Sequence, residues 1–465
     1  MRDLSALIKA YDIRGVVPEQ WGPDLAREVG VAFVEVLGIR AADGGAGKVV
    51  VGHDMRPTGP DLVAAFIDGV TSAGVDVVNI GLCSTDGLYF ASGTLDIPGA
   101  MFTASHNPAE YNGIKLCRAG AAPVGQDSGL ATIRELLEKE NLPKHDGPIG
   151  SATYSDMLAE YSEYLRKLVP LENIRPLKVV IDTGNGMGGF TVPAVLGNQI
   201  LDALPLDIDE MYFELDGTFP NHEANPIDPE NLRDLQKRVL EVGADIGLAF
   251  DGDADRCFVV DNEGQIVDPS TLTALIATRE LAKVPGATII HNLITSKAVP
   301  EIVSENGGTP VRTRVGHSFI KATMAETGAI FGGEHSGHFY FRDFWKADSG
   351  MLAAMHTLAA LGETPAGTSL SEVLRPYARY VASGEINTTV PDAKAVIAKV
   401  KEVSLSMPEF AIDELDGLTV SGDTWWFNLR PSNTEPLLRL NAEGSTVAEM
   451  ERTRDNVLRM IADFS

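Results

Sequence analysis

Cysteine is scarce in this chain of 465 residues, and long hydrophobic runs are missing from it. Cys83, Cys117 and Cys257 form no Cys-x-x-Cys motif and cannot all be paired, so we expect reduced thiols and no disulfide framework. No apolar stretch approaches the ~18 residues that span a bilayer. Residues 1–15 also lack the hydrophobic region of a signal peptide. These features predict a cytoplasmic protein with no membrane partner.

Positively charged residues are also few compared with negatively charged ones. Lys and Arg together number 38 against 65 Asp and Glu, which gives a formal net charge of −27. Nucleic acids and anionic membrane surfaces would be repelled, so neither is expected as a partner. A small anionic substrate remains compatible with this charge, provided that Arg, Lys and backbone N–H groups gather in a local pocket. The sequence leaves monomer and homodimer open.

Short apolar runs do occur, and they alternate with helical patterns along most of the chain. The runs 48–52, 178–182 and 287–291 each end in polar or glycine residues, as strands buried on both faces do. Strands and helices that alternate in this way predict mixed, mostly parallel α/β sheets. The recurrence of the pattern at intervals of about 110–130 residues indicates repeated α/β units.

The pattern changes after Pro365. Segments 381–390 and 424–429 have the composition of strands, and 393–403 and 447–461 that of helices, which predicts a compact βαββα-like unit. We therefore expect four domains, with the boundaries 1–148, 149–258, 259–370 and 371–465.

Three carboxylates follow one of the buried apolar runs in the sequence Asp251-Gly-Asp253-Ala-Asp255-Arg256. Side chains at i, i+2 and i+4 of a glycine-containing loop can converge on one hard cation. An EF-hand does not fit, because its sixth position would be Arg256 and its twelfth Asn262. A solvated acidic turn is the alternative, but three adjacent carboxylates would repel each other there. We expect a metal site, with Mg²⁺ favoured.

A serine and a histidine stand side by side in TASHNP, residues 103–108, where another apolar run ends. Asn-Pro starts turns, so Ser105 and His106 are expected on an exposed loop at a strand end. Loops in that position carry chemistry in α/β proteins. The alternative is that Ser105 only caps a turn.

Two further loops offer groups that suit a sugar phosphate. Residues 332–338, GGEHSGH, combine close backbone approach with Glu, Ser and His, a mixture that suits sugar hydroxyls. Residues 430–436, RPSNTEP, supply a forked cation, hydroxyls and backbone N–H groups, the parts of a phosphate cradle. A polar turn and a capping turn are the respective alternatives.

Taken in order, TASHNP, DGDADR, GEHSGH and RPSNTEP resemble the four signature loops of the α-D-phosphohexomutases, and YDIRG at residues 11–15 resembles another part of the same family. The resemblance covers essentially the whole chain and is strongest to the phosphomannomutase/phosphoglucomutase branch. It implies an α/β fold of four domains around a central cleft. Three related mixed α/β units would be followed by a smaller α+β C-terminal domain.

The resemblance also implies roles for individual residues. Ser105 would carry the transferable phosphoryl group, and a phosphoserine needs its charge neutralised before it can be attacked. The implied Mg²⁺ ligands are Ser105, Asp251, Asp253 and Asp255. The implied catalytic residues are Ser105, His106, Lys115, Arg256 and His338. The implied substrate-binding residues are Tyr11, Arg14, His317, Glu334, Ser336, Arg430, Ser432, Asn433 and Thr434.

For two of these residues the resemblance implies a specific electrostatic role. His106 would support the charge of the phosphoserine beside it. Lys115 is similar to a lysine implicated in general acid/base work, and neighbouring Arg and metal charge would lower its pKa toward use as a base.

The reaction implied by the resemblance is reversible phosphoryl transfer between O1 and O6 of mannose or glucose phosphates. A hexose 1,6-bisphosphate would serve as intermediate and activator. The sugar loop lacks the glutamine typical of phosphoglucosamine mutases and has His335 where dual-specificity enzymes often carry an apolar residue. The alternatives are a phosphoglucosamine mutase, a metal-dependent sugar phosphatase and a non-catalytic mutase-like protein.

Overall fold

The computed structural model describes residues 2–464 except 40–46, 408 and 432–436. The chain forms two compact units, which we describe separately. The first unit comprises Met1–Val267 and Ser336–Val373, and the second comprises Asp268–His335 and Leu374–Ser465. The four predicted domain boundaries are not tested by this division and stay a prediction.

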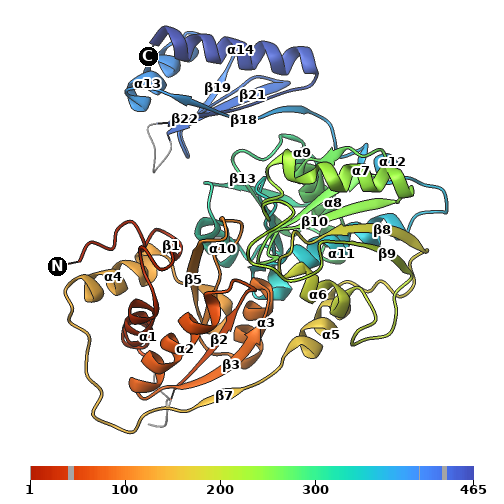
Figure 1. Ribbon diagram of the computed structural model, residues 1–465. Coiled ribbons are helices and arrows are strands. Elements are labelled where there is room, and N and C mark those ends of the chain that lie inside the picture. The colour runs from red at the N-terminus through yellow and green to blue at the C-terminus, as the bar shows by residue number, and fades with distance from the viewer. Residues whose placement is uncertain (1, 40–46, 408, 432–436, 465) are drawn as a thin grey trace. The chain divides into compact units, whose positions relative to one another are not determined.

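A mixed sheet in the order β1-β5-β4-β2-β3-β7 opens the first unit, with β6 paired to β5 (Figure 1). Its strands β2, β3, β4 and β7 are parallel, whereas β1 and β5 run antiparallel to their neighbours. The strand bounds are β1 Ile13–Val16, β2 Lys48–His53, β3 Asp76–Leu82, β4 Gly99–Phe102, β5 Tyr111–Arg118, β6 Ala122–Pro123 and β7 Ala152–Tyr154. The helices of this part are α1 Pro23–Leu37, α2 Gly59–Ser72, α3 Thr85–Leu95 and α4 Leu130–Glu138.

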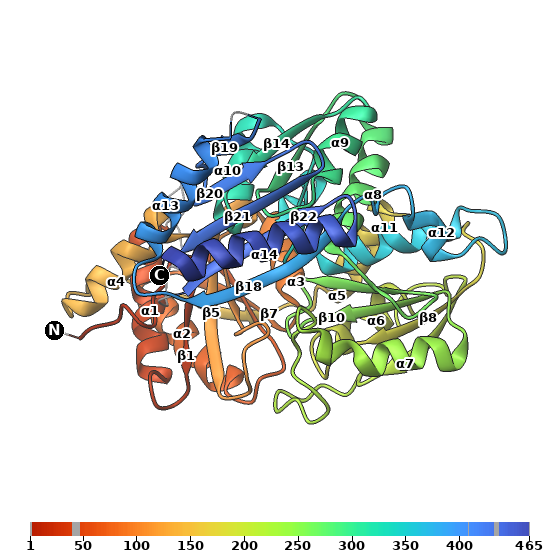
Figure 2. The ribbon, with the colours of Figure 1, turned by 90° about the horizontal axis from the view of Figure 1, so that it is seen from above.

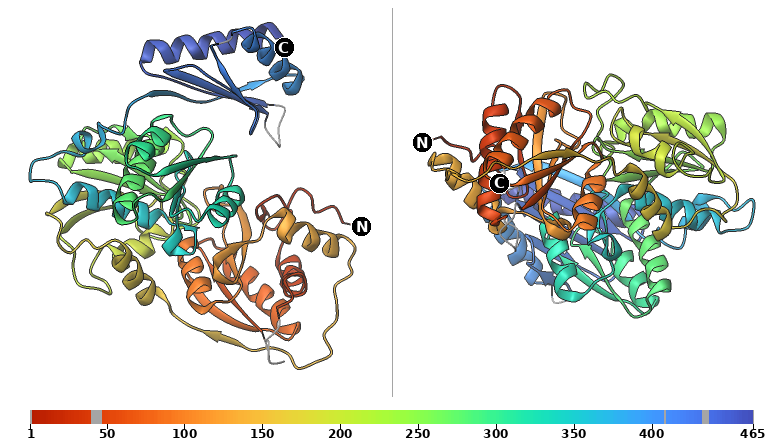
Figure 3. Two further views of the ribbon diagram at one scale, coloured as in Figure 1. Left: turned by 180° about the vertical axis from the view of Figure 1, so that it is seen from behind. Right: turned by 90° about the horizontal axis from the view of Figure 1, so that it is seen from below.

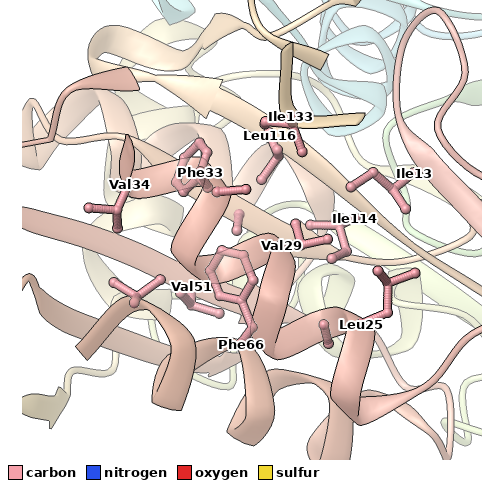
Figure 4. Packing of buried hydrophobic residues seen from close by; sticks show 14 of the residues in the cluster. Ile13, Leu25, Val29, Phe33, Val34, Val51, Phe66, Ile114, Leu116 and Ile133 are labelled. Carbon is pink, nitrogen blue, oxygen red and sulfur yellow. The ribbon is translucent and has the colours of Figure 1, made fainter. Parts of the chain in front are cut away.

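The core of this sheet is built where α1, α2 and α4 meet it (Figure 4). The ring of Phe66 on α2 is fully buried, with its centroid 6.0 Å from that of Phe33 on α1 and 5.4 Å from that of Phe102 on β4. Such burial of aromatic area is the main term that holds helices on a sheet. It fixes the carboxyl end of β4, from which the TASHNP loop emerges.

We expect Phe66→Ala to lower the free energy of unfolding by about 3–5 kcal/mol, because a cavity replaces a fully buried ring. Urea unfolding of the full chain measures it. Leu95→Ala, at a position that is 39% exposed, is the control and should change little. A loss below about 1 kcal/mol for Phe66→Ala would show that the core closes around the gap.

A second sheet in the first unit has the order β12-β11-β10-β8-β9. Strands β8, β9 and β10 are parallel, and β11 returns antiparallel to β10. Helix α7 packs along β8 and β10, as Figure 2 shows. The bounds are β8 Leu177–Asp182, β9 Leu206–Met211, β10 Ile246–Phe250, β11 Cys257–Asp261, β12 Ile266–Val267, α5 Leu158–Leu168, α6 Gly188–Val195 and α7 Arg233–Val242.

The rest of the first unit is a short hairpin and a buried helix. Strands β16 (Phe339–Phe341) and β17 (Ala347–Asp348) pair antiparallel, and α11 (Gly350–Gly362) follows them. Helix α12 (Leu370–Leu374) ends at the border between the two units.

The second unit begins with a parallel arrangement in which β13 lies between β14 and β15. The bounds are β13 Thr288–Asn292, β14 Thr309–Thr313, β15 Phe331–Gly333, α8 Pro269–Lys283, α9 Ala298–Glu305 and α10 His317–Thr327. The apolar runs predicted at 48–52, 178–182 and 287–291 are therefore found as the parallel strands β2, β8 and β13.

The C-terminal part is an antiparallel sheet in the order β18-β22-β21-β20-β19, with α13 and α14 on one face (Figure 3). The bounds are β18 Val381–Thr389, α13 Ala393–Leu405, β19 Ala411–Asp413, β20 Leu418–Ser421, β21 Trp425–Pro431, β22 Leu437–Gly444 and α14 Val447–Phe464. The predicted βαββα unit is corrected to one with five strands. Strands β19 and β20 are three and four residues long, too short for a clear alternation of apolar and polar residues.

Among the described residues, no helix combines the length and the apolar character that crossing a membrane requires.

Candidate active site

Ser105 lies just beyond the end of β4, on a loop whose backbone is tightly held. Its N–H donates to Oγ1 of Thr103 at 2.8 Å, and its φ is +52°, a conformation that non-glycine residues rarely adopt. Backbone strain of this kind persists only where surrounding contacts enforce it, and it clusters at functional sites. The prediction of an exposed loop is wrong for this residue, because only 4% of Ser105 is accessible.

The contact that holds the loop comes from Arg56, a residue that the sequence analysis missed. Its guanidinium is 1% exposed and donates to the carbonyl oxygens of Ser105 at 3.0 Å, Asn107 at 2.6 Å, and Pro108 and Tyr111 at 2.8 Å each. Five N–H donors in a fixed fork can satisfy several backbone acceptors at once, which lysine could not do. A basic residue four positions after the end of the predicted strand 48–52 was the only signal in the sequence.

The aspartate loop connects β10 to β11 and reaches Ser105. The Ser105 hydroxyl donates to Oδ2 of Asp251 at 2.9 Å. Asp251, Asp253 and Asp255 are each fully buried, and each offers an oxygen within 4.8 Å of the others. The alternative of a solvated acidic turn is thereby excluded.

These carboxylates fit a divalent cation. Oδ1 of Asp253 is buried without a hydrogen-bond partner, and such an oxygen is costly unless a cation or water satisfies it. Burial raises the pKa of Asp251 to about 7, and Asp255 and Asp253 act in the same direction against Arg256. A hard cation coordinated by oxygens would relieve both the repulsion and the missing contact.

Lys115 on β5 is the nearest cation to two of the carboxylates. Its Nζ lies 2.7 Å from Oδ2 of Asp253 and 2.6 Å from Oδ2 of Asp255. Burial disfavours the ammonium, but these two carboxylates outweigh it, so the pKa of Lys115 lies well above its usual value. The expectation of a lowered pKa for Lys115 is therefore wrong while both carboxylates contact its ammonium.

Arg256, directly after the aspartates, contacts both Ser105 and Asp251. Its guanidinium lies 3.2 Å from the Ser105 hydroxyl and 2.7 Å from Oδ2 of Asp251, and it also contacts Nδ1 of His106. Burial lowers the pKa of His106 to about 2, and Arg256 and Arg14 add to this effect. His106 is therefore neutral and accepts a hydrogen bond, so any support that it gives a phosphoserine would come from hydrogen bonding and not from positive charge.

Two other predicted residues lie near the same loop. Arg14 on β1 donates to Oδ1 of Asn107 at 2.5 Å and to the Ala104 carbonyl at 3.2 Å. His338 lies with Nε2 3.7 Å from Oδ1 of Asp255, and its Nδ1 is 2.9 Å from Oγ of Ser336. The first unit thus gathers Arg14, Ser105, His106, Lys115, the three aspartates, Arg256, Ser336 and His338.

The remaining predicted residues lie elsewhere. Tyr11 precedes β1 and is 42% exposed. Glu334 in the second unit is buried, and its Oε1 accepts from Gly316 N at 3.3 Å and Asn292 Nδ2 at 3.4 Å. Arg430 on β21 forms an ion pair with Glu385. The side chain of His317 and residues Ser432, Asn433 and Thr434 lie outside the described part of the chain.

Four domain models of one family match consecutive stretches of the chain. All carry the description phosphoglucomutase/phosphomannomutase: alpha/beta/alpha domain I at residues 5–144, domain II at 159–264, domain III at 268–380 and the C-terminal domain at 385–460.

Individual proteins match over nearly their full length. A phosphomannomutase of Salmonella montevideo is 40% identical over 457 residues, covering 97% of this chain and 98% of that protein. A protein of Xanthomonas campestris described as phosphohexose mutases is 40% identical over 458 residues, with the same coverage. The crystal structure of a phosphoglucomutase/phosphomannomutase family protein from Burkholderia thailandensis matches with a TM-score of 0.87 and 33% identity, covering 99% of this chain and 98% of that one.

A buried hydroxyl between a carboxylate cluster and a guanidinium is suited to phosphoryl transfer, which depends on positioning and on neutralising charge. With the matches above, it defines an enzyme of the phosphotransferase, or mutase, class. The chain belongs to the phosphoglucomutase/phosphomannomutase family.

Proposed function

We propose that the protein interconverts the 1-phosphate and the 6-phosphate of mannose, of glucose or of both, by way of a phosphorylated Ser105 and a hexose 1,6-bisphosphate. The single observation that carries the proposal is the position of the Ser105 hydroxyl, 2.9 Å from Asp251 and 3.2 Å from Arg256. A phosphoryl group there would be close to both a cation site and a guanidinium.

In the first step the P–O bond to Ser105 breaks while a bond forms from phosphorus to the free hydroxyl of the sugar phosphate. The proton of the attacking hydroxyl passes by way of a general base to the departing serine oxygen, which becomes the Ser105 hydroxyl again. That hydroxyl is then phosphorylated from the other end of the bisphosphate by the reverse of the same step. Arg256 and Arg14 would balance the phosphoryl charge. Lys115 would have to lose contact with Asp253 or Asp255 before it could serve as a base.

The proposed ligands of Mg²⁺ are the three aspartates and an oxygen on Ser105. A bound Mg²⁺ supplies charge neutralisation at a phosphoryl oxygen. The orphaned Oδ1 of Asp253 supports this assignment.

Two measurements test the proposal. Intact-mass analysis of the purified protein should show an adduct of about 80 Da on Ser105, the mass of one phosphoryl group. Coupled assays with the 1-phosphates of mannose, glucose and glucosamine, run side by side, should give 6-phosphates of the first or second. Release of inorganic phosphate would indicate a sugar phosphatase, turnover of the glucosamine ester alone a phosphoglucosamine mutase, and neither product a non-catalytic protein.

For the loops of the second unit, we propose that Glu334 orients the sugar hydroxyls and that Arg430 binds the phosphate that is not reacting. We expect Glu334→Ala to act mainly on kcat, because a misaligned hydroxyl no longer lines up with the phosphoserine. Steady-state kinetics on one sugar 1-phosphate measures it. An increase in KM alone would contradict the role of Glu334.

We expect Arg430→Ala to raise KM by about 10- to 150-fold, since a charge-assisted phosphate contact is worth roughly 1.5–3 kcal/mol in both ground and transition states. Arg439→Ala is a matched control. Arg439 lies on β22, next to β21, and its Nη1 is 3.2 Å from Oε1 of the same Glu385 that pairs with Arg430. Equal effects of the two substitutions would mean that loss of the ion pair, and not of a phosphate contact, is being measured.

A further inference from the structure

A second group of buried metal-ligating side chains lies beside the three aspartates and shares one of them. Asp255, His338 and Asp348 are each buried, and each offers a ligand atom within 4.8 Å of the other two. Asp348 ends strand β17 of the first unit and belongs to none of the signature loops. No role assigned above uses it.

The backbone holds these residues rigidly. His338 forms an isolated antiparallel bridge with Arg256, the residue after Asp255. Asp348 pairs in register with Tyr340, two residues after His338. His338 and Asp348 are therefore placed by strand pairing, and Asp255 directly precedes a bridged residue, which gives the ordered backbone that a metal site needs.

The two oxygens of Asp255 face different groups. Oδ2 contacts the ammonium of Lys115 at 2.6 Å. Oδ1 is buried without a hydrogen bond and lies 3.7 Å from Nε2 of His338 and 3.9 Å from Nε of Arg256. This carboxylate can therefore bind an ion on the side of His338 while its other oxygen stays near the catalytic aspartates.

Ser336 lies beside the imidazole of His338. Its Oγ lies 2.9 Å from Nδ1 of His338, so a hydrogen on Nδ1 can be donated to it. In that tautomer Nε2 presents its lone pair toward Asp255. Metal-binding histidines are commonly fixed in this way by a hydrogen bond from the other ring nitrogen.

We propose that Asp255, His338 and Asp348 form a second cation site, which takes a transition-metal ion such as Zn²⁺, Co²⁺ or Mn²⁺. A set of one imidazole and two carboxylates suits these ions, whereas Mg²⁺ prefers oxygen ligands alone. Asp255 is shared with the first site, so the two ions influence each other through one carboxylate, as in two-metal centres.

The test titrates Co²⁺ into the full chain by equilibrium dialysis and by ¹H NMR. The wild type should bind about two equivalents and show a paramagnetically shifted, exchangeable imidazole N–H signal, which only a histidine ligand produces. Asp348→Asn should weaken binding at the second site by at least about 10-fold and lose that signal. Asp343→Asn is the matched control, since Asp343 is an exposed carboxylate on the same segment and should leave both readouts unchanged.

His338→Gln must also abolish the imidazole signal, which assigns the signal to this ring even if Asp348→Asn fails to fold. Absence of the signal from the wild type with Co²⁺ bound, or its persistence in either variant, would overturn the second site. If the wild type shows the imidazole signal but binds only about one equivalent of Co²⁺, the second site is supported and the aspartate loop is not a cation site for Co²⁺. The measurement does not depend on turnover, so failure of the proposed mutase reaction would be seen separately.

Discussion

Ser105→Ala should reduce mutase turnover by on the order of 10³-fold or more, because the residue that would carry the phosphoryl group is lost. The fold should survive. Asp251 keeps its contact with Nε of Arg256 at 2.8 Å when the hydroxyl is removed. The loop backbone remains held by Arg56, which bonds to carbonyl oxygens and not to the serine side chain.

The measurement is kcat on a mannose or glucose 1-phosphate, combined with intact mass and thermal melting. Ser92→Ala is a matched control, because Ser92 is another buried serine of the first unit whose hydroxyl donates to the Ile97 carbonyl at 2.7 Å. The control should remain active and carry the ~80 Da adduct, which the Ser105 variant should lack. Turnover above about a tenth of wild type in Ser105→Ala would rule out the phosphoserine assignment.

The strands that carry the site could be predicted from the sequence because each has a continuous apolar run that ends in polar residues. The runs before TASHNP and before Asp251 became β4 and β10, which lie in two different sheets. Each strand has a parallel neighbour, and each loop leaves the carboxyl end of its strand, where α/β sheets place their sites. Nothing in such a pattern reports how deeply a loop is buried. Ser105 was therefore expected to be exposed.

The electrostatic state of the site depends on which charges meet, and a linear sequence does not show this. Lys115 is 138 and 140 residues away from the two carboxylates that raise its pKa. His106 is neutral because burial and the charge of Arg256, 150 residues further on, act on it together. Arg56 escaped attention for the same reason, since its four carbonyl partners lie about fifty residues away.

Asp253→Asn should raise the Mg²⁺ concentration needed for half-maximal activity by at least about 10- to 100-fold and slow the saturated enzyme by orders of magnitude. Loss of a side chain that only hydrogen-bonds to a metal ligand already lowers metal affinity or activity by about 10- to 100-fold. Here one of the anionic ligands itself is lost. The amide also places an N–H₂ group or a weaker acceptor against Thr85 and Lys115, which lie 2.5 and 2.7 Å from Oδ2 of Asp253. The measurement is initial rate against Mg²⁺ concentration at fixed substrate.

Asp261→Asn controls for the loss of a buried carboxylate nearby, at the end of β11, the strand that follows the aspartate loop. Its Oδ1 accepts from the backbone N–H groups of Glu263 at 2.9 Å and Gln265 at 2.8 Å, and an amide oxygen can still accept both. The control should therefore keep the Mg²⁺ dependence of the wild type. If Asp253→Asn shares that unchanged dependence, or if the wild type works at full rate with Mg²⁺ chelated, the aspartate loop does not hold the catalytic ion. Oδ1 of Asp253, which is buried without a hydrogen-bond partner, would then need a partner other than Mg²⁺.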